Sequence, residues 1–298
     1  MRIIAPDMTQ LDQFLAQAAT LLTRLEAILP PSGIVPDWSA GTAFRWRKQG
    51  GKEGRGYLQP VAHMARIALS DLHNIEAQKQ QIDQNTRQFV QGRPANNVLL
   101  TGARGTGKSS LIKACLNQYA AQGLRLIEVD KDDLCDLPDI VDLVAGRPER
   151  FIIFCDDLSF EEGESGYKAL KVALDGSIAA QSDNVLIYAT SNRRHLMPER
   201  MSDNATYVHT EGGDLHPGET VEEKISLSER FGLWVSFYPF KQDDYLDIVA
   251  HWLRHFGCTA QQIDDARADA LRWALQRGSR SGRVAWQFAR DYAGKADQ

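Results

Sequence analysis

Residues 98–110 combine residue types that are suited to binding phosphate. They read Val-Leu-Leu-Thr-Gly-Ala-Arg-Gly-Thr-Gly-Lys-Ser-Ser, and from Gly102 to Ser109 they match the pattern G-x-x-x-x-G-K-S of the P-loop. The three glycines let the backbone turn so that successive N–H groups face one anion. The helix expected after the loop would point its N-terminus at the same anion. The pattern therefore predicts a site for the phosphates of a nucleotide.

Two side chains of this loop have specific expected roles. Lys108 can reach the β- and γ-phosphates as a point charge, and the Ser109 hydroxyl can ligate Mg²⁺. The rest of the loop would cradle the phosphates with its backbone N–H groups. The nucleotide-binding residues of the loop are therefore expected to be Gly102, Ala103, Arg104, Gly105, Thr106, Gly107, Lys108, Ser109 and Ser110.

Two adjacent carboxylates form a second candidate site. Residues 151–155 are continuously apolar, as expected of a strand buried on both faces, and Asp156 and Asp157 follow directly. In a P-loop protein, a carboxylate at a strand end can hold the Mg²⁺ shell, usually through water. A second acid beside it can polarise the attacking water as a general base. Because many strands end in Asp, the pattern alone is weak evidence for a metal site. Its position after a P-loop is what favours that interpretation. We expect Asp156 at the metal and Asp157 as the base.

The elements that must position these residues follow from the apolar runs. From residue 97 onward strands and helices alternate, which favours a parallel sheet covered by helices. Five strands are expected, at 97–101, 124–129, 151–155, 184–190 and 233–238. Helices are expected between them at 108–121, 138–145 and 165–180. After residue 240 the pattern is helical throughout, which predicts a small helical subdomain with helices at 242–256, 260–277 and 281–293.

The residues before the P-loop are expected to be mainly helix and loop. An apolar stripe predicts an amphipathic helix over 9–29, which either packs on the body of the protein or meets a partner subunit. Helical spacing returns over 61–90. A helix just before a P-loop strand can supply one wall of a base pocket, and Leu72 and Ile75 are the candidates for this wall.

A Gly- and Pro-rich stretch over 31–57 is expected to be a loop. Within it, residues 44–57 carry five basic residues and one acid, interleaved with three aromatic residues. Such a composition could bind phosphates and stack on bases, as in a protein with a loader-like role on DNA. The alternative is a solvated linker whose aromatic side chains pack on the body. Nucleic acid binding by 44–57 is therefore possible but not favoured.

Composition limits the class of protein. The chain has 298 residues, of which 43% are hydrophobic, and a net charge of −5. These values suit a globular protein with one large or two small domains, and they do not demand a broad nucleic-acid-binding surface. The four cysteines form no C-x-x-C pair, which argues against a metal cluster or a disulfide framework. No apolar run approaches the roughly 18 residues of a membrane span, so we expect no membrane partner and a cytoplasmic location.

With these motifs in order, the chain resembles the AAA+ P-loop ATPases over about residues 70–294. Ile187–Asn192 resembles the sensor-1 strand, and the resemblance implies that Asn192 orients water near the γ-phosphate. Ser-Glu-Arg-Phe-Gly at 228–232 resembles the segment with the arginine finger, which implies that Arg230 acts in the site of a neighbouring subunit. Residues 279–285 resemble the sensor-2 helix start of the lid, with Arg283 as the better match and Arg280 as the reserve.

More narrowly, the chain resembles an uncharacterised bacterial ATP-binding family that carries a domain-of-unknown-function label. The segments that carry this resemblance are 96–102, 156–161 and 228–232. The resemblance implies ATP and Mg²⁺ as cofactors and a homo-oligomer that works on an unidentified protein partner. One departure stands out: most AAA+ hydrolases have Asp-Glu where this chain has Asp156-Asp157. Because aspartate is one methylene shorter, the base lies farther from the water unless Glu161 or Glu162 replaces it.

These observations predict an α/β fold with a five-stranded parallel sheet of the P-loop (AAA+) type, a C-terminal helical lid and an N-terminal helical extension. The expected parts are 1–60, 61–240 and 241–298. The first functional hypothesis is a Mg²⁺-dependent ATPase that remodels a protein or protein–nucleic acid assembly. The second is a nucleotide-gated binding module with little or no hydrolysis, which the shorter Asp157 favours. A small-molecule kinase is a third possibility, against which the terminal helices and the Ser-Glu-Arg-Phe-Gly segment count.

Overall fold

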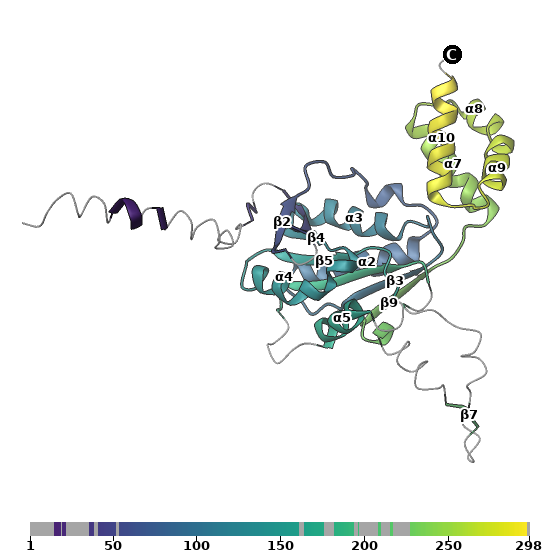
Figure 1. The fold of residues 1–298 in the computed structure, drawn as a ribbon. Helices are drawn as coiled ribbons and strands as arrows, with labels where there is room; N and C mark the ends of the chain where they lie inside the picture. Colours follow the sequence, from purple (N-terminus) through teal and green to yellow (C-terminus); the bar gives the residue numbers. More distant parts are fainter. Residues whose placement is uncertain are drawn as a thin grey trace, which may run out of the picture.

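A computed structural model describes residues 15–18, 20–21, 36–38, 41–51, 54–160, 164–175, 182–193, 196, 208–209, 215–216 and 227–296. A seven-stranded sheet in the order β2-β1-β4-β5-β6-β3-β9 forms its centre (Figure 1). A separate two-stranded pair joins β7 and β8. The strands are β1 (Ala43–Lys48), β2 (Gly56–Pro60), β3 (Val98–Gly102), β4 (Leu124–Glu128), β5 (Arg150–Cys155), β6 (Val185–Ser191), β7 (Val208–His209), β8 (Leu215–His216) and β9 (Leu233–Phe237).

The five predicted strands all form, but the predicted count for the sheet is wrong. β4, β5, β6, β3 and β9 are parallel neighbours, as expected. β1 extends this sheet as a further parallel strand, and β2 pairs with β1 in the antiparallel direction at the edge. The sheet is therefore mixed, with seven strands rather than five.

The two extra strands come from the stretch that was expected to be a loop. Phe44 and Trp46 are buried on one face of β1, while Arg45 and Arg47 alternate with them. Gly56 on β2 lies under the Trp46 ring, where a Cβ atom would come within 1.8 Å of a ring carbon. Gly56, one of the glycines that suggested a loop, is therefore needed for the close packing of the two strands of the hairpin. The alternation of aromatic and basic residues is the strand signal that the loop prediction overlooked.

Helices cover both faces of the sheet, so the described core has three layers. One face of the sheet packs against α2 and α3, and the other packs against α4 and α5. Along β3, for example, Val98 and Leu100 belong to the first cluster and Leu99 to the second. The helices of the core are α2 (Glu76–Val90), α3 (Lys108–Tyr119), α4 (Leu137–Val144) and α5 (Ser165–Asp175), with short 3₁₀ turns at Leu69–Asp71, Ala120–Gln122 and Lys131–Asp136.

Residues 61–75 are not helical, contrary to the prediction of helical material over 61–90. Only α2 forms within that range, preceded by the single 3₁₀ turn. The side chain of Asn117 on α3 donates to the carbonyls of Ala65 and Ile67, at 2.9 and 2.8 Å, and so holds the segment in an extended path. The apolar residues of this segment pack on the core without helical geometry, which is why their spacing was misleading.

The predicted helical subdomain after residue 240 is present as four helices. They are α7 (Gln242–His255), α8 (Ala260–Asp265), α9 (Arg267–Gln276) and α10 (Gly282–Ala296). Together they form a lid beside the carboxyl end of β9, with α10 packed along α7 (Figure 1). The helix predicted over 9–29 lies mostly outside the described residues, although 15–18, 20 and 21 are helical. The division of the chain at residues 60 and 240 stays a prediction.

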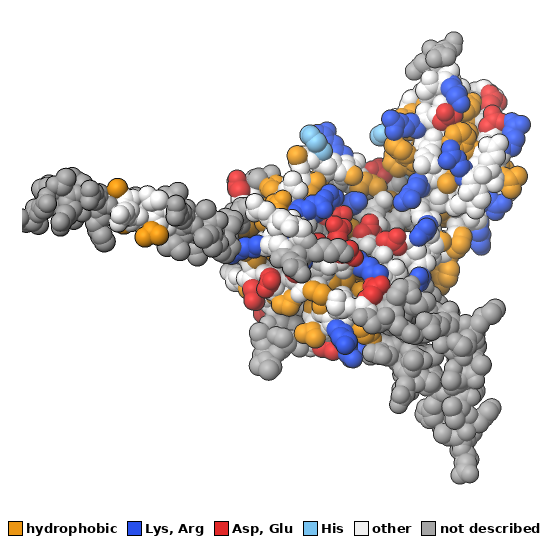
Figure 2. All heavy atoms as spheres, viewed as in Figure 1, with side chains coloured by type: hydrophobic (Ala, Val, Ile, Leu, Met, Phe, Trp, Pro, Cys, Tyr) orange, Lys and Arg blue, Asp and Glu red, His pale blue; other side chains and the backbone are white. Residues whose placement is uncertain are grey.

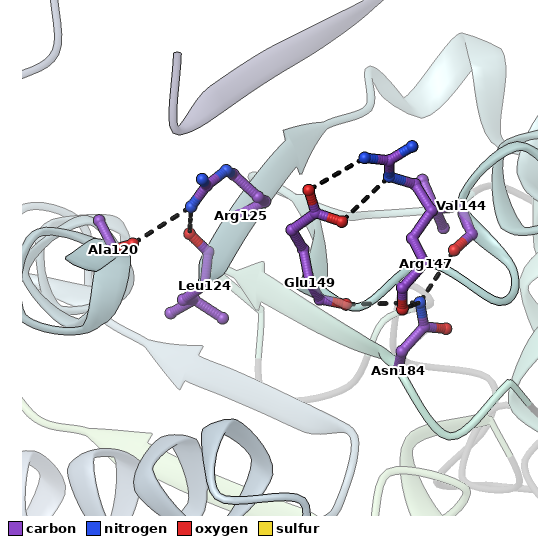
Figure 3. A network of polar contacts seen from close by, with 7 residues as sticks. All are labelled: Ala120, Leu124, Arg125, Val144, Arg147, Glu149 and Asn184. Atoms are coloured by element: carbon purple, nitrogen blue, oxygen red, sulfur yellow. Dashed lines mark hydrogen bonds and ion pairs between the residues drawn. The ribbon is translucent and has the colours of Figure 1, made fainter. Parts of the chain in front are cut away.

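A polar network closes the end of the sheet opposite the P-loop (Figure 3). The side-chain amide of Asn184, just before β6, donates to the carbonyls of Val144 and Arg147 at 2.8 and 3.1 Å and more weakly to that of Glu149. Arg147 holds the Glu149 carboxylate with two hydrogen bonds of 3.0 Å, which lowers the pKa of Glu149. The buried Asn184 therefore fixes the turn between α4 and β5.

We expect Asn184→Ala to reduce the free energy of unfolding by about 1–3 kcal/mol, because it leaves buried carbonyl groups without a donor. Urea unfolding followed by circular dichroism measures this loss. Asp183→Ala is the matched control, because Asp183 is exposed and only its backbone carbonyl takes part in a described hydrogen bond, from Arg150. Equal unfolding midpoints for both variants would contradict the role given to Asn184.

Candidate nucleotide site

The strand order brings the two sequence motifs to one edge of the sheet. β5, β6 and β3 are consecutive neighbours, so their carboxyl ends lie side by side. This is the edge at which ligands bind in open α/β sheets. A cavity of about 830 Å³ lies there, between the P-loop, the segment 65–75 and the lid. Figure 2 shows Lys and Arg side chains gathered with Asp and Glu side chains on the face between core and lid.

Most of the predicted site residues line this cavity. The P-loop contributes residues 104–110, and the strand ends contribute both carboxylates and the amide predicted for sensor 1. Gly102 and Ala103 lie at the start of the loop without lining the cavity, and Arg230 is also absent from its lining. The predicted residues that line it are Ile75, Arg104, Gly105, Thr106, Gly107, Lys108, Ser109, Ser110, Asp156, Asp157, Asn192 and Arg283.

The P-loop backbone needs glycine at its first and last turns. Gly102 has a φ of 123°, and a Cβ atom there would come within 1.9 Å of the carbonyl oxygen of Phe237 on β9. Gly107 has a φ of 101° and is the N-cap of α3. Both positions lie in the region of positive φ that favours glycine. The sequence therefore bends the chain sharply between β3 and α3 and points the helix N-terminus into the cavity.

Lys108 is buried and has only uncharged partners in direct hydrogen bonds. Its ammonium group donates to the carbonyls of Gly102 and Ala103, both at 2.8 Å, and to Oδ1 of Asn192 at 3.0 Å. Burial lowers the pKa of Lys108, and the positive charges of Arg104 and Arg283 lower it further, while the two carboxylates raise it. A bound phosphate would add negative charge beside this ammonium group and stabilise its charged form.

Asp156 is the point at which the P-loop, β5 and β6 meet. Its Oδ1 accepts hydrogen bonds from the Ser109 hydroxyl and the Thr190 hydroxyl, both at 2.6 Å. The Thr190 oxygen in turn accepts a hydrogen bond of 2.9 Å from the backbone N–H of Asp157. Thr190 on β6 thus orients both Asp156, the predicted metal ligand, and Asp157, the predicted base.

Asp157 and Asn192 contact each other across the ends of β5 and β6. The side-chain amide of Asn192 donates to Oδ1 of Asp157, while its own oxygen accepts from Lys108. Asp157 has a φ of 53°, a left-handed conformation that Asp tolerates better than most residues. Asp157, with this uncommon backbone conformation, lies next to Asn192, the sensor-1 candidate. Residues in such conformations are often found at functional sites.

The donor set fits Mg²⁺ although it forms no complete protein cage. In the described residues, no group of three or more His, Cys, Asp or Glu side chains could hold a metal ion. Ser109 and Asp156 offer two oxygen atoms that are already adjacent. Mg²⁺ usually takes one or two protein oxygens and completes its shell with phosphates and water. The two predicted ligands therefore suit an ion that arrives with a nucleotide.

Apolar side chains form the wall of the cavity next to the P-loop. Leu72 and Ile75 are buried, and both lie beside Gly107, within 4 Å of the position where a Cβ atom would stand. They come from the extended segment and the N-cap of α2, rather than from a helix. Trp252 and Ile248 of α7 complete this side from the lid. The apolar wall is suited to a planar base, with the core and lid each supplying part of it.

The two arginines predicted for sensor 2 point to different cavities. Arg283, at the start of α10, lines the nucleotide cavity. Arg280 lines a second cavity of about 740 Å³ next to it. The N–H of Gly282 donates to the carbonyl of Gly105 at 2.9 Å, so the lid contacts the P-loop directly. Of the two candidates, only Arg283 has a position from which it could sense a nucleotide.

Arg230 lies away from the phosphate site of its own chain. Its Nε donates to Oδ1 of Asp175, the last residue of α5, at 2.6 Å. The structure therefore does not bring Arg230 together with Lys108 and Asp156. Its predicted action in a neighbouring subunit stays a prediction.

Sequence reasoning missed several residues of the site. Thr190 stands within the predicted sensor-1 strand, but only its hydrogen bonds to neighbouring residues show its role. Trp252 and Trp286 line the cavity from α7 and α10, and no local pattern distinguishes them from core tryptophans. Glu161 and Glu162, the alternatives to Asp157, lie outside the described residues.

Three basic residues of the stretch 44–57, Arg45, Arg47 and Lys48, pair with acids of their own chain. Arg45 pairs with Glu128 at 2.6 Å and Lys48 with Asp136 at 2.9 Å. The Trp46 indole N–H also donates to Asp136, at 2.8 Å. This pairing reduces the positive charge that the hairpin offers to phosphates.

None of the helices in the described part is long and apolar enough to span a membrane.

Comparisons with known proteins bear on the family and the fold of the chain. The family model described as "Protein of unknown function (DUF815)" matches residues 39–296. The structure is similar to the RuvB Holliday junction branch migration motor of Thermotoga maritima, with 15% identity, a TM-score of 0.50, and 75% of this chain and 63% of that chain covered. A point variant of the same RuvB gives 14% identity, a TM-score of 0.51 and the same coverage. The chain thus spans less than two thirds of RuvB. A search of curated proteins gave no match.

We expect Thr190→Val to weaken the Mg²⁺ dependence of nucleotide binding, because Asp156 and Asp157 both lose their common partner. Thr190→Ser keeps the hydroxyl and should behave like the wild type. Titration of a fluorescent ATP analogue at increasing Mg²⁺ concentration measures the difference. An unchanged Mg²⁺ midpoint in a folded Thr190→Val protein would contradict the positioning role.

Proposed function

The chain belongs to the family described as "Protein of unknown function (DUF815)" and has the fold of AAA+ P-loop ATPases, and from this we propose that it is a Mg²⁺-dependent ATPase. The observation that carries the proposal is the shared hydrogen-bond network of Lys108, Ser109, Asp156, Asp157 and Asn192 in one cavity. A P-loop alone would support phosphate binding only. The addition of two carboxylates and an amide at the same edge supports hydrolysis.

The P-loop would bind the triphosphate. Lys108 would exchange its carbonyl and amide partners for the β- and γ-phosphates, and the loop N–H groups would donate to the same oxygens. Ser109 and Asp156 would hold Mg²⁺, which offsets phosphate charge when bound. Thr190 would keep Asp156 oriented after the Ser109 hydroxyl turns to the ion.

Asp157 and Asn192 would act on the attacking water. The release of Lys108 would leave the side-chain oxygen of Asn192 free to accept a hydrogen bond from water at the γ-phosphate. Asp157, directly beside it, would accept the proton. Both groups stand close together in the structure, which reduces the reorganisation needed for the reaction.

Completion of the site would need a second subunit. Arg230 is positioned away from its own cavity, so it would stabilise the transition-state charge in a neighbouring site of a homo-oligomer. Arg283 would contact the nucleotide from α10, so that the position of the lid would depend on which nucleotide is bound. The contact between Gly282 and Gly105 supplies a direct mechanical connection for this step.

The work driven by hydrolysis would be the remodelling of a protein or protein–nucleic acid assembly. The fold shared with a branch migration motor supports this class of work by analogy only. The paired charges of the hairpin do not favour nucleic acid binding through 44–57. We therefore propose a protein partner.

A nucleotide-gated binding module is the second candidate. Asp157 is shorter than the glutamate of most AAA+ hydrolases, and its carboxylate is already engaged by Asn192. Such an arrangement could bind ATP and close the lid without hydrolysis. The absence of turnover in a protein that binds ATP would favour this candidate.

Phosphate release measured against protein concentration tests the enzyme proposal. We expect the specific activity of the wild type to rise with concentration, because Arg230 would act between subunits. Lys108→Ala should abolish it, and Arg230→Ala should reduce it by about 10³-fold or more, the usual contribution of an arginine finger. Arg267→Ala is the control, since Arg267 is an exposed lid arginine that lines neither cavity. Phosphate release that stays at background at every concentration would overturn the proposal.

A further inference from the structure

Two histidines meet where the lid contacts the core. His73 belongs to the segment 65–75, and His251 lies on α7 of the lid. Their ring centroids are 4.1 Å apart, and the ring planes are tilted by 51°. Nε2 of each ring is buried, and neither atom has a hydrogen-bond partner among the described residues. Buried polar atoms without a partner are rare in proteins, so this histidine contact calls for an explanation.

The segment that carries His73 holds α7 at a second place. Asn74 has a φ of 62°, and its side-chain amide donates to the carbonyl of Asp244, in the first turn of α7, at 2.9 Å. The same segment is fastened to α3, the helix that follows the P-loop, by the side chain of Asn117. The segment thus connects the P-loop helix to the lid, and the histidine contact is part of that connection.

The histidine contact lies beside the nucleotide cavity. Asp71, Leu72 and His73 line the cavity from the segment. Trp252, the residue after His251, lines it from α7, and its ring contacts that of His251 with centroids 5.0 Å apart. A movement of α7 away from the segment would therefore open the cavity along its apolar wall.

A proton added to either ring would place a charge in this contact. A neutral imidazole has one N–H donor, whereas the protonated ring has two. The nearest carboxylate oxygen to Nε2 of His251 is Oδ1 of Asp71, at 3.9 Å, which is beyond hydrogen-bond distance. The added N–H group would therefore lack an acceptor, and two protonated rings would repel each other at this short separation.

The surroundings of His251 disfavour its charged form. Burial is the largest cause that lowers the pKa of His251, and His73 lowers it further. On α7 itself, His255 and Arg254 act in the same direction, while Asp71 of the segment raises the pKa. No charged group of the described helices α8, α9 or α10 is among these causes.

The direction of the pH dependence follows from this difference. If α7 moves away from the segment, His251 regains an ordinary pKa of about 6.5. Protons then bind more readily to the open arrangement than to the closed one. The closed arrangement is therefore most stable above about pH 6.5, and it loses stability as the pH falls through that value.

We propose that His73 and His251 form a proton-sensitive contact between core and lid, which is closed when both rings are neutral and opens when they are protonated. Closure retains the nucleotide in its cavity, and acidification speeds its release. The effect on the nucleotide rests on the proposed function, whereas the opening of the contact does not.

Hydrogen exchange of the full chain without nucleotide tests the contact itself. Exchange of the amides in 65–75 and in α7 is compared at about pH 7.5 and about pH 6.0, after correction for the intrinsic pH dependence of exchange. Protection in the wild type should fall by about threefold or more at the lower pH. In His73→Phe/His251→Phe it should stay within about 1.5-fold, because the phenyl rings keep the packing and take up no proton.

His63→Gln is the matched control, because His63 is exposed and does not line the nucleotide cavity. This variant should show the pH dependence of the wild type. His251→Phe alone should reduce the pH dependence, and it replaces the double variant if circular dichroism shows that the latter is unfolded. A double variant with the same pH dependence as the wild type, or a wild type with none, would overturn the proposal.

Stopped-flow dissociation of a fluorescent ATP analogue with Mg²⁺ tests the effect on the nucleotide. Because the γ-phosphate also takes up a proton in this pH range, the wild type is compared with the double variant at each pH. Dissociation should be about threefold faster at the lower pH in the wild type than in the double variant. Equal rates in both proteins would overturn the effect on release. A wild type that binds no analogue at either pH would count against the ATPase, while hydrogen exchange still decides on the contact.

Discussion

The site depends on one carboxylate that three elements share. Oδ1 of Asp156 accepts from Ser109 at the start of α3 and from Thr190 on β6, and Asp156 directly follows the last residue of β5. This contact requires that β5, β6 and β3 be adjacent and parallel, which is the order observed. The Thr190 oxygen also accepts a hydrogen bond from the backbone N–H of Asp157 and so fixes the position of that residue. The rest of the site, including Asn192 and Lys108, is placed relative to this junction.

The predictable parts of the structure were those fixed by local sequence. The P-loop needs positive φ at Gly102 and Gly107, and the apolar run before Asp156 can only be a buried strand, so motif and strand were predicted together. The hairpin was missed because its glycines were read as loop signals, whereas Gly56 is required by the Trp46 ring of the opposite strand. The apolar spacing over 61–75 led to a wrong prediction of helix. Side chains of an extended segment that packs on a core can have the same spacing as the apolar face of a helix. The role of Thr190 depends on strands far apart in sequence, and no spacing reveals it.

The distribution of charge separates the functional candidates. Arg45 and Arg47 of the hairpin are paired with acids within the chain, whereas Arg104 and Arg283 line the nucleotide cavity without a hydrogen-bond or ion-pair partner among the described residues. A site with this excess of positive charge is suited to a triphosphate. The short Asp157, held by Asn192, leaves hydrolysis as the step most in need of a test.

Calorimetric titration of ATP with and without Mg²⁺ tests the central claim most directly. If Ser109 and Asp156 form the Mg²⁺ site, the wild type binds ATP about tenfold or more tightly when Mg²⁺ is present. Asp156→Asn should keep the binding but lose the gain from Mg²⁺, and Lys108→Ala should lose the binding itself. Equal affinity with and without Mg²⁺ in the wild type, or the same gain in Asp156→Asn, would contradict the account.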